Sequence, residues 1–271
     1  MAIFDYKLHD SKVKIYNELF CNAKPFPHIV IDDFLVAEST DELLSEFDDV
    51  DNWNHYVHFN ERKMATMHFE NFGSGTQRVI NELSSPGFLK FLSGVSGVDH
   101  LIADPSLDGG GLHQIKAGGF LNVHADYQSH PVNSKWSREL NLLLYLNKDW
   151  DEDWNGKLEL WDDEMREAVI SVKPDFNRCV IFKTSATSMH GHPEPLICPT
   201  DKSRKSLALY YFIEHDQALN VESTFYKPRP DDSSSNKVLI RLDNSLVRIY
   251  TYLKRYLGIS DDLVSRILKK F

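Results

Sequence analysis

The sequence predicts a mainly β protein with flanking helices, whose strands form a double-stranded β-helix, or jelly roll. Short β-rich runs separated by turn residues recur between Leu112 and Phe212, and apolar residues with helical spacing lie on both sides of this region. Many short strands at regular spacing are typical of a β barrel or sandwich. A His-x-Asp pair on one β-rich run and a Ser-x-His-Gly segment far downstream complete the pattern.

The composition fits one substantial core. The chain has 271 residues, of which 42% are hydrophobic and 12% aromatic, so a barrel with helical additions can bury enough surface. The formal net charge of −10 argues against a nucleic-acid partner, because binding phosphates requires clustered Lys and Arg. No run approaches the roughly 18 apolar residues of a membrane span, and the first residues lack a signal-peptide pattern. We therefore expect a cytoplasmic protein.

The cysteines agree with a reducing compartment. Cys21, Cys179 and Cys198 are too few and too scattered for a disulfide framework. Cys179 begins an apolar run and is expected to be buried in the core.

Residues 1–110 are expected to support the barrel. The opening twenty residues favour a helix, and a β-rich run follows at 25–34. Residues 39–42, Ser-Thr-Asp-Glu, match a helix-capping box. The polar and aromatic segment 53–71 is expected to be a loop or irregular strands. Apolar stripes in 76–83 and 88–95 predict two helices that brace one face of the barrel.

Residues 111–216 are expected to form the jelly-roll core. Three glycines at 109–111 turn the chain tightly into a first strand. The strands expected in this core are 112–116, 119–126, 138–147, 157–161, 168–172, 177–182 and 204–212. Two four-stranded sheets rolled together would bring distant side chains to one open end of the barrel.

Two of these side chains have the spacing of metal ligands. His124 and Asp126 project from one face of their strand, because side chains alternate along a strand. His190 or His192, which share a strand face, supplies the third ligand. Two histidines and one carboxylate leave half of an octahedron open, as in non-haem Fe(II) oxygenases. The alternative is a surface histidine beside a turn aspartate.

Arg204 is expected to point into the barrel. The same alternation places Arg204 and Ser206 inward and Lys205 outward, and it places Asn141 and Tyr145 on one face. A 2-oxoglutarate molecule that chelates iron through its keto acid would leave its other carboxylate deep in the barrel, where an unpaired charge is costly. A guanidinium satisfies that carboxylate with two parallel hydrogen bonds, and Tyr145 offers another donor.

Several motifs follow one another between about residues 111 and 214. They are G-G-x-x-x-x-H-x-D, L-Y-L-N-K-D-W-D, N-G-K-L-E-L, K-P-x-F-x-R-x-V-I-F, S-x-H-G and R-K-S-L-A-L-Y-Y-F. In this order they resemble the Fe(II)/2-oxoglutarate dioxygenases of the prolyl-hydroxylase type. The resemblance implies hydroxylation of a C–H bond with decarboxylation of 2-oxoglutarate to succinate. It implies Fe(II), 2-oxoglutarate and O2 as cofactor and cosubstrates, with ascorbate as a candidate activator.

The resemblance also implies roles for individual residues. Its iron ligands are His124, Asp126 and His190, because similar proteins place the histidine before the glycine and Pro193 then ends strand pairing. The residues implied for 2-oxoglutarate are Arg204, Tyr145, Ser206 and Leu158.

The chain departs from the resemblance at one position. Many relatives carry a tyrosine nine or ten residues before the first iron histidine, where this chain has Gln114 and Ile115. Gln114 is the candidate for the missing polar contact to the cosubstrate. The departure also leaves the substrate open among a prolyl residue in a peptide, free proline or another amino acid, and a sugar or nucleotide.

The loop 127–137 is expected to cover the site and exclude water during the reaction. His130 and Trp136 in this loop are the candidate substrate contacts, and the alternative is a plain surface loop. His192 is expected at the pocket mouth or as a cap on its turn.

The C-terminal part is expected to be helical. Residues 217–237 include a Pro- and Ser-rich tract that predicts a linker. In 238–271, Leu246, Ile249, Leu253 and Leu257 form one stripe, and a last helix starts near Ser260. These helices are expected to pack on the barrel or on a second subunit of a homodimer. Weak membrane contact through their basic residues is the alternative.

Two other classes of function compete with the enzyme. One is a cupin-like barrel that binds a metal or a sugar without oxidative chemistry, and the other is an interaction protein with a degenerate site. Arg204 discriminates between them, because a simple binding barrel has no need of an inward cation next to Ser206.

Overall fold

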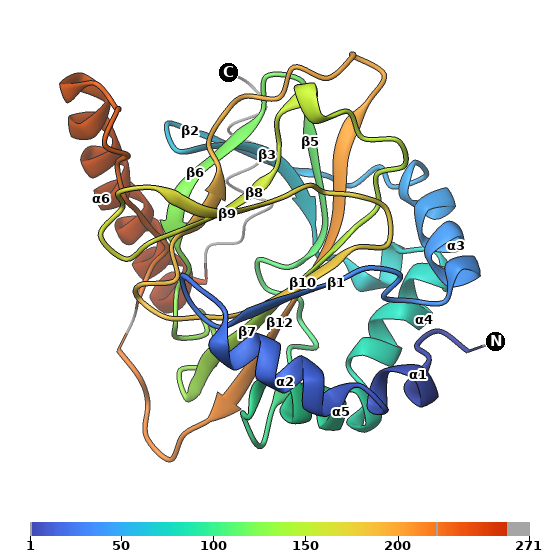
Figure 1. Cartoon of the computed structure of the whole chain (residues 1–271). Coiled ribbons are helices and arrows are strands. Elements are labelled where there is room, and N and C mark those ends of the chain that lie inside the picture. The colour runs from blue at the N-terminus through green and yellow to red at the C-terminus, as the bar shows by residue number, and fades with distance from the viewer. Residues whose placement is uncertain (1, 221, 259–271) are drawn as a thin grey trace.

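A computed structural model describes residues 2–220 and 222–258 of the chain. An antiparallel sheet curls into a half-barrel, and most of the helices cover one side of it (Figure 1). The helices are α1 (Tyr6–Asp10), α2 (Val13–Asn22), α3 (Ala37–Phe47), α4 (Ser74–Leu83), α5 (Pro86–Ser96) and α6 (Ser234–Leu257), with short 3-10 turns at Phe69–Asn71 and Glu152–Trp154.

The described part of the sheet contains thirteen strands. They are β1 (His28–Ile31), β2 (Asn54–His58), β3 (Glu61–Thr66), β4 (Ile102–Ala103), β5 (Gly111–Lys116), β6 (Phe120–Ala125), β7 (Trp136–Tyr145), β8 (Leu158–Trp161), β9 (Ala168–Val172), β10 (Cys179–Lys183), β11 (His190–His192), β12 (Ser203–Glu214) and β13 (Phe225–Tyr226). The main path runs β1-β10-β7-β12-β5-β3-β6-β11-β8-β9. The mainly β fold with flanking helices is therefore confirmed.

The two faces of β7 explain the position of the core. Leu140, Leu142 and Leu144 face the helices and join a large apolar cluster. Tyr145 alternates with them and packs inside the barrel with a second, smaller cluster. Because successive side chains of a strand point to opposite faces, one strand serves both the helical layer and the barrel interior.

The hairpin of β2 and β3 replaces the loop or irregular strands expected at 53–71. Its strands pair in register from Asn54 with Ala65 to His58 with Glu61. β3 also pairs with β5 and with β6. It therefore connects two halves of the barrel into one continuous sheet. The inward-facing residues of this segment are polar because they line a cavity. The segment therefore lacks the alternation of apolar and polar residues that predicts a strand.

The capping box expected at 39–42 is also wrong. α3 begins at Ala37 and its N-cap is Val36, which makes no side-chain cap. Ser39 therefore lies inside the first turn and is buried. Glu46, near the other end of α3, accepts hydrogen bonds from the backbone N–H groups of Gly75 and Thr76 at the start of α4. This carboxylate ties the two helices together.

The C-terminal segment is more structured than the expected linker. β13 pairs with β6, the predicted metal strand, and α6 begins at Ser234 within the range 217–237. α6 lies on the opposite side of the barrel from α3 and α4 (Figure 1). The last helix expected from Ser260 lies outside the described residues, and the homodimer stays a prediction.

α6 docks through a different face from the predicted stripe. Ile240 and Asp243 are buried, whereas Leu246, Ile249 and Leu257 are mostly exposed. Polar contacts fix the helix instead. Asp243 accepts hydrogen bonds from His58 and from Asn60, at 2.7 and 2.6 Å. Further along the helix, Lys254 and Asp108 form an ion pair at 2.9 Å.

Within the part of the chain that the structure covers, no helix combines the length and the apolar character needed to cross a membrane. All three cysteines are free, and Cys179 is buried as expected.

We predict that Gly111→Ala destabilises the protein by about 3 kcal/mol or more. Gly111 has φ of +80°, and an added Cβ would collide with the backbone oxygen of Thr66 on β3. Gly118→Ala is the matched control, because Gly118 has φ of +78° with open space around it and carries only the conformational cost of about 1–2 kcal/mol. Urea unfolding measures both, and equal losses would contradict the close approach of β3 and β5.

We predict that stability falls between pH 6.5 and about 9 because of His58. Burial lowers the pKa of His58, but hydrogen bonds to Asp243 and Glu61 outweigh burial and raise it to about 9. The stabilisation is full below 6.5, the unfolded-state value, and is lost as pH rises through the folded value. It amounts to roughly 2 kcal/mol after allowing for partial exposure. Urea unfolding of the wild type and His58→Gln across this range tests this; parallel pH profiles would reject it.

Candidate metal centre

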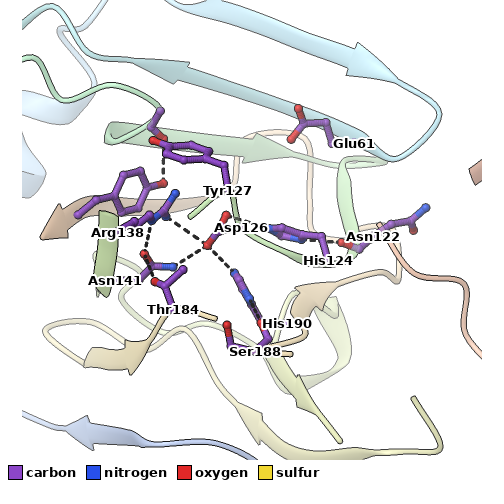
Figure 2. A network of polar contacts seen from close by, with 12 residues as sticks. Glu61, Asn122, His124, Asp126, Tyr127, Arg138, Asn141, Thr184, Ser188 and His190 are labelled. Carbon is purple, nitrogen blue, oxygen red and sulfur yellow. Dashed lines mark hydrogen bonds and ion pairs between the residues drawn. The ribbon is translucent and has the colours of Figure 1, made fainter. Parts of the chain in front are cut away.

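Three side chains from two neighbouring strands converge at one end of the barrel. His124 on β6 and His190 on β11 are cross-strand partners, and Asp126 follows β6 directly. The Nε2 atoms of His124 and His190 lie 3.5 and 3.4 Å from the two carboxylate oxygens of Asp126 (Figure 2). One ligand atom from each residue lies within 4.8 Å of the others. This spacing suits a single metal ion.

Backbone carbonyls fix the orientation of both imidazoles. The Nδ1 of His124 lies 2.9 Å from the carbonyl oxygen of Asn122, and the Nδ1 of His190 lies 2.9 Å from that of Ser188. Because a carbonyl only accepts, each Nδ1 carries the proton and each Nε2 presents a lone pair to the site. Burial and the neighbouring His124 lower the pKa of His190 to about 4, which keeps its ring neutral.

Asp126 is held by a polar network behind it. Asn141 donates a hydrogen bond of 2.6 Å to its carboxylate, and Arg138 forms an ion pair with it at 3.2 Å. Arg138 and Thr184 both donate to the amide oxygen of Asn141, which fixes the direction of the amide (Figure 2). Burial alone would raise the pKa of Asp126, but Arg138 and the two histidines hold it well below its usual range. The carboxylate is therefore ionised and aimed at the histidines.

Arg204 is buried inside the same barrel. Its Nε donates to the carbonyl of Gly156 at 2.8 Å, and one terminal nitrogen donates to the Tyr145 hydroxyl at 3.2 Å. Among the described residues, no carboxylate forms an ion pair with it, and burial lowers its pKa. Burial also raises the pKa of Tyr145, so that hydroxyl keeps its proton and has it free to donate. A buried cation without an anion is costly, and this one is arranged to receive one.

The other residues predicted beside Arg204 surround it as the strand pattern requires. Ser206 is buried, pairs with Tyr145 across the sheet, and lies on the same face of β12 as Arg204. Leu158 packs against Tyr145 in the apolar cluster of the barrel interior. An added Cβ on Gly156 would meet the Arg204 side chain, so the glycine leaves room for the guanidinium.

His192 does not lie at the pocket mouth and does not cap its turn. It is 3% exposed, and neither ring nitrogen has a hydrogen-bond partner among the described residues. Burial, with Arg204 and Lys63 nearby, lowers its pKa well below the usual value, so its ring is neutral. His190 and His192 lie two residues apart on β11 and project from the same face of the strand, so both rings lie inside the barrel. An unsatisfied buried imidazole is a polar group that a bound ligand could satisfy.

Gln114 is placed away from this pocket. It pairs with Lys205 across the sheet, on the face opposite to Arg204, and its amide donates to the Ser203 hydroxyl. The alternation along β5 instead directs His113 and Ile115 toward the interior, where they pair with Ser206 and Arg204. Gln114 therefore lies on the wrong face of the sheet to contact a cosubstrate bound at Arg204.

His130 and Trp136 have packing contacts in place of the expected substrate contacts. His130 is buried, contacts Asp104 at 3.3 Å, and accepts hydrogen bonds from two backbone N–H groups of its own loop. Its ring packs on Trp136 and Phe212. The loop 127–137 still contributes to the site, because Tyr127 and Pro131 line the cavity above the metal ligands.

That cavity has a volume of about 380 Å³ and opens onto His124 and Asp126. Its walls come from β2 and β3, from the loop around Gly109, and from α6. Residues that the sequence did not single out here are His58, Glu61, Lys63, Arg138, Tyr210, Tyr226, Asp243 and Lys254. On a strand, Glu61 and Lys63 project from the same face, because they are two residues apart. This spacing is the feature of the sequence that could have predicted a charged cavity wall here.

The sequence comparisons agree with this geometry. Residues 110–212 match the family model of the 2OG-Fe(II) oxygenase superfamily. The mouse (Mus musculus) prolyl 3-hydroxylase OGFOD1 is 26% identical over 213 residues, which cover 75% of this chain. The chain spans only 35% of the length of that relative.

Solved structures share the fold. A prolyl hydroxylase from Trichoplax adhaerens, in complex with a peptide fragment of the hypoxia inducible factor, has a TM-score of 0.57 and 17% identity, covering 77% of this chain and 93% of its own. A prolyl 4-hydroxylase from Pseudomonas putida has a TM-score of 0.54 and 14% identity, covering 75% and 100%. Residues 110–212 are thus similar in sequence to the 2OG-Fe(II) oxygenase superfamily, and the chain shares its fold with solved prolyl hydroxylases.

Proposed function

We propose that this chain is an Fe(II)- and 2-oxoglutarate-dependent hydroxylase that acts on an aliphatic C–H bond. In the overall reaction, substrate, 2-oxoglutarate and O2 give hydroxylated substrate, succinate and CO2. Bound Fe(II) would supply the chemistry that activates O2, so that one oxygen atom enters the substrate and the other enters succinate. Ascorbate, by keeping iron ferrous, is expected to stimulate turnover.

One observation carries the proposal: the His124, Asp126 and His190 cluster shares the barrel interior with a buried guanidinium that lacks an anionic partner among the described residues. Three ligands leave open positions for a chelating keto acid. The distal carboxylate of 2-oxoglutarate would then receive hydrogen bonds from Arg204 and Tyr145, with Ser206 beside them. The unpartnered ring of His192 adds a polar group to the same pocket. A cupin-like barrel that binds only a metal or a sugar would leave the buried guanidinium of Arg204 without an anion to pair with.

The protein's own residues would prepare the site before any ligand enters. Arg138 and Asn141 hold the Asp126 carboxylate in one orientation, and two backbone carbonyls hold the imidazoles. The hydroxyls of Tyr127 and Tyr210 donate to the carbonyls of Asp108 and Gly109, which fixes the loop beside the cavity. Their ring centres lie 4.8 and 3.3 Å from the Cζ atom of the Arg138 guanidinium, as in cation–π contacts. Little reorganisation is then required when the ligands bind.

The relatives favour a cyclic or otherwise saturated carbon as the target. The curated relative is a prolyl 3-hydroxylase, and the two structures are a prolyl hydroxylase and a prolyl 4-hydroxylase. Proline-like chemistry is therefore part of the proposal, whether the proline is in a peptide or in a smaller molecule.

We predict that Asp126→Ala lowers succinate formation at least about a hundredfold, because loss of a partner that merely orients a ligand already costs 10–100-fold. Calorimetric titration with Mn(II) should show a comparable loss of metal affinity. Asp163→Ala, which removes an exposed carboxylate outside the site, is the control. Full turnover by the Asp126 variant would remove this residue from the mechanism.

We predict that Arg204→Met weakens binding of 2-oxoglutarate about tenfold to a hundredfold, the value of a charged hydrogen-bonded pair. Arg204→Lys should retain part of the affinity, because it keeps the charge but loses the planar fork. Lys205→Met is the control on the outer face of the same strand. Fluorescence titration with Mn(II) present measures the affinity.

The melting temperature of the ligand-free Arg204→Met protein should stay unchanged or rise, because the substitution removes an unpaired buried charge. A large fall in melting temperature with no change in affinity would show that Arg204 serves stability and not the cosubstrate.

A further inference from the structure

Glu61 and Lys63 place opposite charges side by side in the wall of the cavity. They lie two residues apart on β3, so both project from one face of the strand, and Lys63 Nζ lies 3.1 Å from Glu61 Oε2. Both line the same cavity as His124 and Asp126. Figure 2 shows Glu61 across the site from Asn141 and Thr184, so Glu61 lies on a different side of His124, Asp126 and His190 from the network behind Asp126.

Both groups keep capacity for another partner. The ammonium group of Lys63 has three N–H donors, and its ion pair with Glu61 uses one of them. The carboxylate of Glu61 also accepts from His58 at 3.0 Å, yet each of its oxygens has a second lone pair. Burial lowers the pKa of Lys63, but Glu61, Tyr210 and Asp126 outweigh it and raise that pKa, so the side chain stays charged.

The other charges of the cavity are paired within the protein. Lys254 is paired with Asp108, and Asp243 is paired with His58. Arg138 is paired with Asp126 behind the metal cluster. The cavity therefore has no large excess of either sign. A ligand that carries both a positive and a negative group fits this balance better than an anion or a cation.

The dimensions of the cavity favour a small ligand. Its volume of about 380 Å³ is near the lower end of the roughly 300–1,000 Å³ range of small-molecule sites. β2 forms one wall and α6 the facing wall, where Val247, Tyr250 and Thr251 line the space. Contacts at Asp243 and Lys254 fix α6 near both ends of this wall. An extended peptide would need this helix to move.

We propose that the substrate of this site is a free α-amino acid, whose carboxylate binds Lys63 and whose ammonium group binds Glu61. The side chain then points toward the metal cluster, between the tyrosines that line the cavity. This inference rests on the proposed hydroxylase function and specifies the substrate class that the function leaves open. A site with buried polar groups rejects analogues that lack the matching group, so capping either charge should abolish recognition.

The experiment measures succinate formed from 2-oxoglutarate by the full chain with Fe(II). L-Proline and the other common α-amino acids are added one at a time, each beside its N-acetyl amide, and a proline-containing peptide capped at both ends is tested in parallel. We expect at least one free amino acid to raise succinate formation about fivefold or more over the uncoupled rate, and its capped form to have no effect. Mass spectrometry should show the hydroxylated amino acid.

Lys63→Met should raise the KM of that amino acid at least about tenfold, while the dissociation constant of 2-oxoglutarate with Mn(II) stays unchanged. Lys63→Arg should recover part of the loss, and Glu61→Gln should weaken recognition of the ammonium group. Lys205→Met, on the outer face of β12, is the matched control. Thermal melts of each variant separate a folding defect from a loss of recognition.

The outcomes separate the two proposals. If 2-oxoglutarate fails to bind and no compound yields succinate, the hydroxylase function itself fails. If 2-oxoglutarate binds but only the capped peptide, or no amino acid, stimulates turnover, the amino-acid inference alone is overturned. An unchanged KM in a folded Lys63→Met protein would also overturn it.

Discussion

The pairing of β6 with β11 is the constraint on which the site depends. In this register His124 lies directly across from His190, and the short step from β6 to Asp126 brings a carboxylate between the two rings. A one-residue slip would turn a histidine to the opposite face of the sheet, because side chains alternate along a strand. β13 pairs along β6 on the side away from β11 and helps to hold this register. The convergence of His124, Asp126 and His190 is thus a consequence of backbone hydrogen bonding between the strands.

Two buried arginines in the barrel show how one residue type serves different purposes. Arg138 is paired with Asp126, contacts the rings of Tyr127 and Tyr210, and is hydrogen-bonded to Asn141, so its charge is compensated within the protein. Arg204 has only a carbonyl and a phenol as described partners. A buried ion pair contributes orientation at little net cost, whereas a buried unpaired cation lowers stability until an anion arrives. The surroundings of Arg138 are thus complete within the protein, whereas those of Arg204 leave its charge to be paired by a ligand.

The β2–β3 hairpin and α6 form walls of the cavity beside the candidate metal ligands. His58 connects the two, since it contacts Glu61 on the hairpin and Asp243 on the helix. The same hairpin joins the two halves of the sheet and carries Lys63 into the cavity. The cavity wall, the continuity of the sheet and the position of α6 are therefore coupled through a few polar contacts on one strand pair. The family model matches residues 110–212, whereas the hairpin and α6 lie outside that range.

The sequence by itself determined the elements whose residues repeat with a clear period. The strand runs of the core, the helical stripes of α4 and α5, and the facing of Arg204, Ser206 and Tyr145 follow from local alternation, which requires no knowledge of distant neighbours. It also determined the candidate ligands, because His-x-Asp and a later histidine have few other uses in one barrel.

Only the tertiary structure decided which side chains meet across long distances in the chain. The hairpin 54–66 is polar because it faces a cavity, so its pattern resembled a loop. The apolar stripe of α6 faces outward because Asp243 and Lys254 anchor the helix through partners that lie far away in the sequence. His130, Trp136 and Gln114 have residue types suited to a site but point elsewhere. Contact across a barrel depends on strand order and register, and no local pattern of residues specifies either of these.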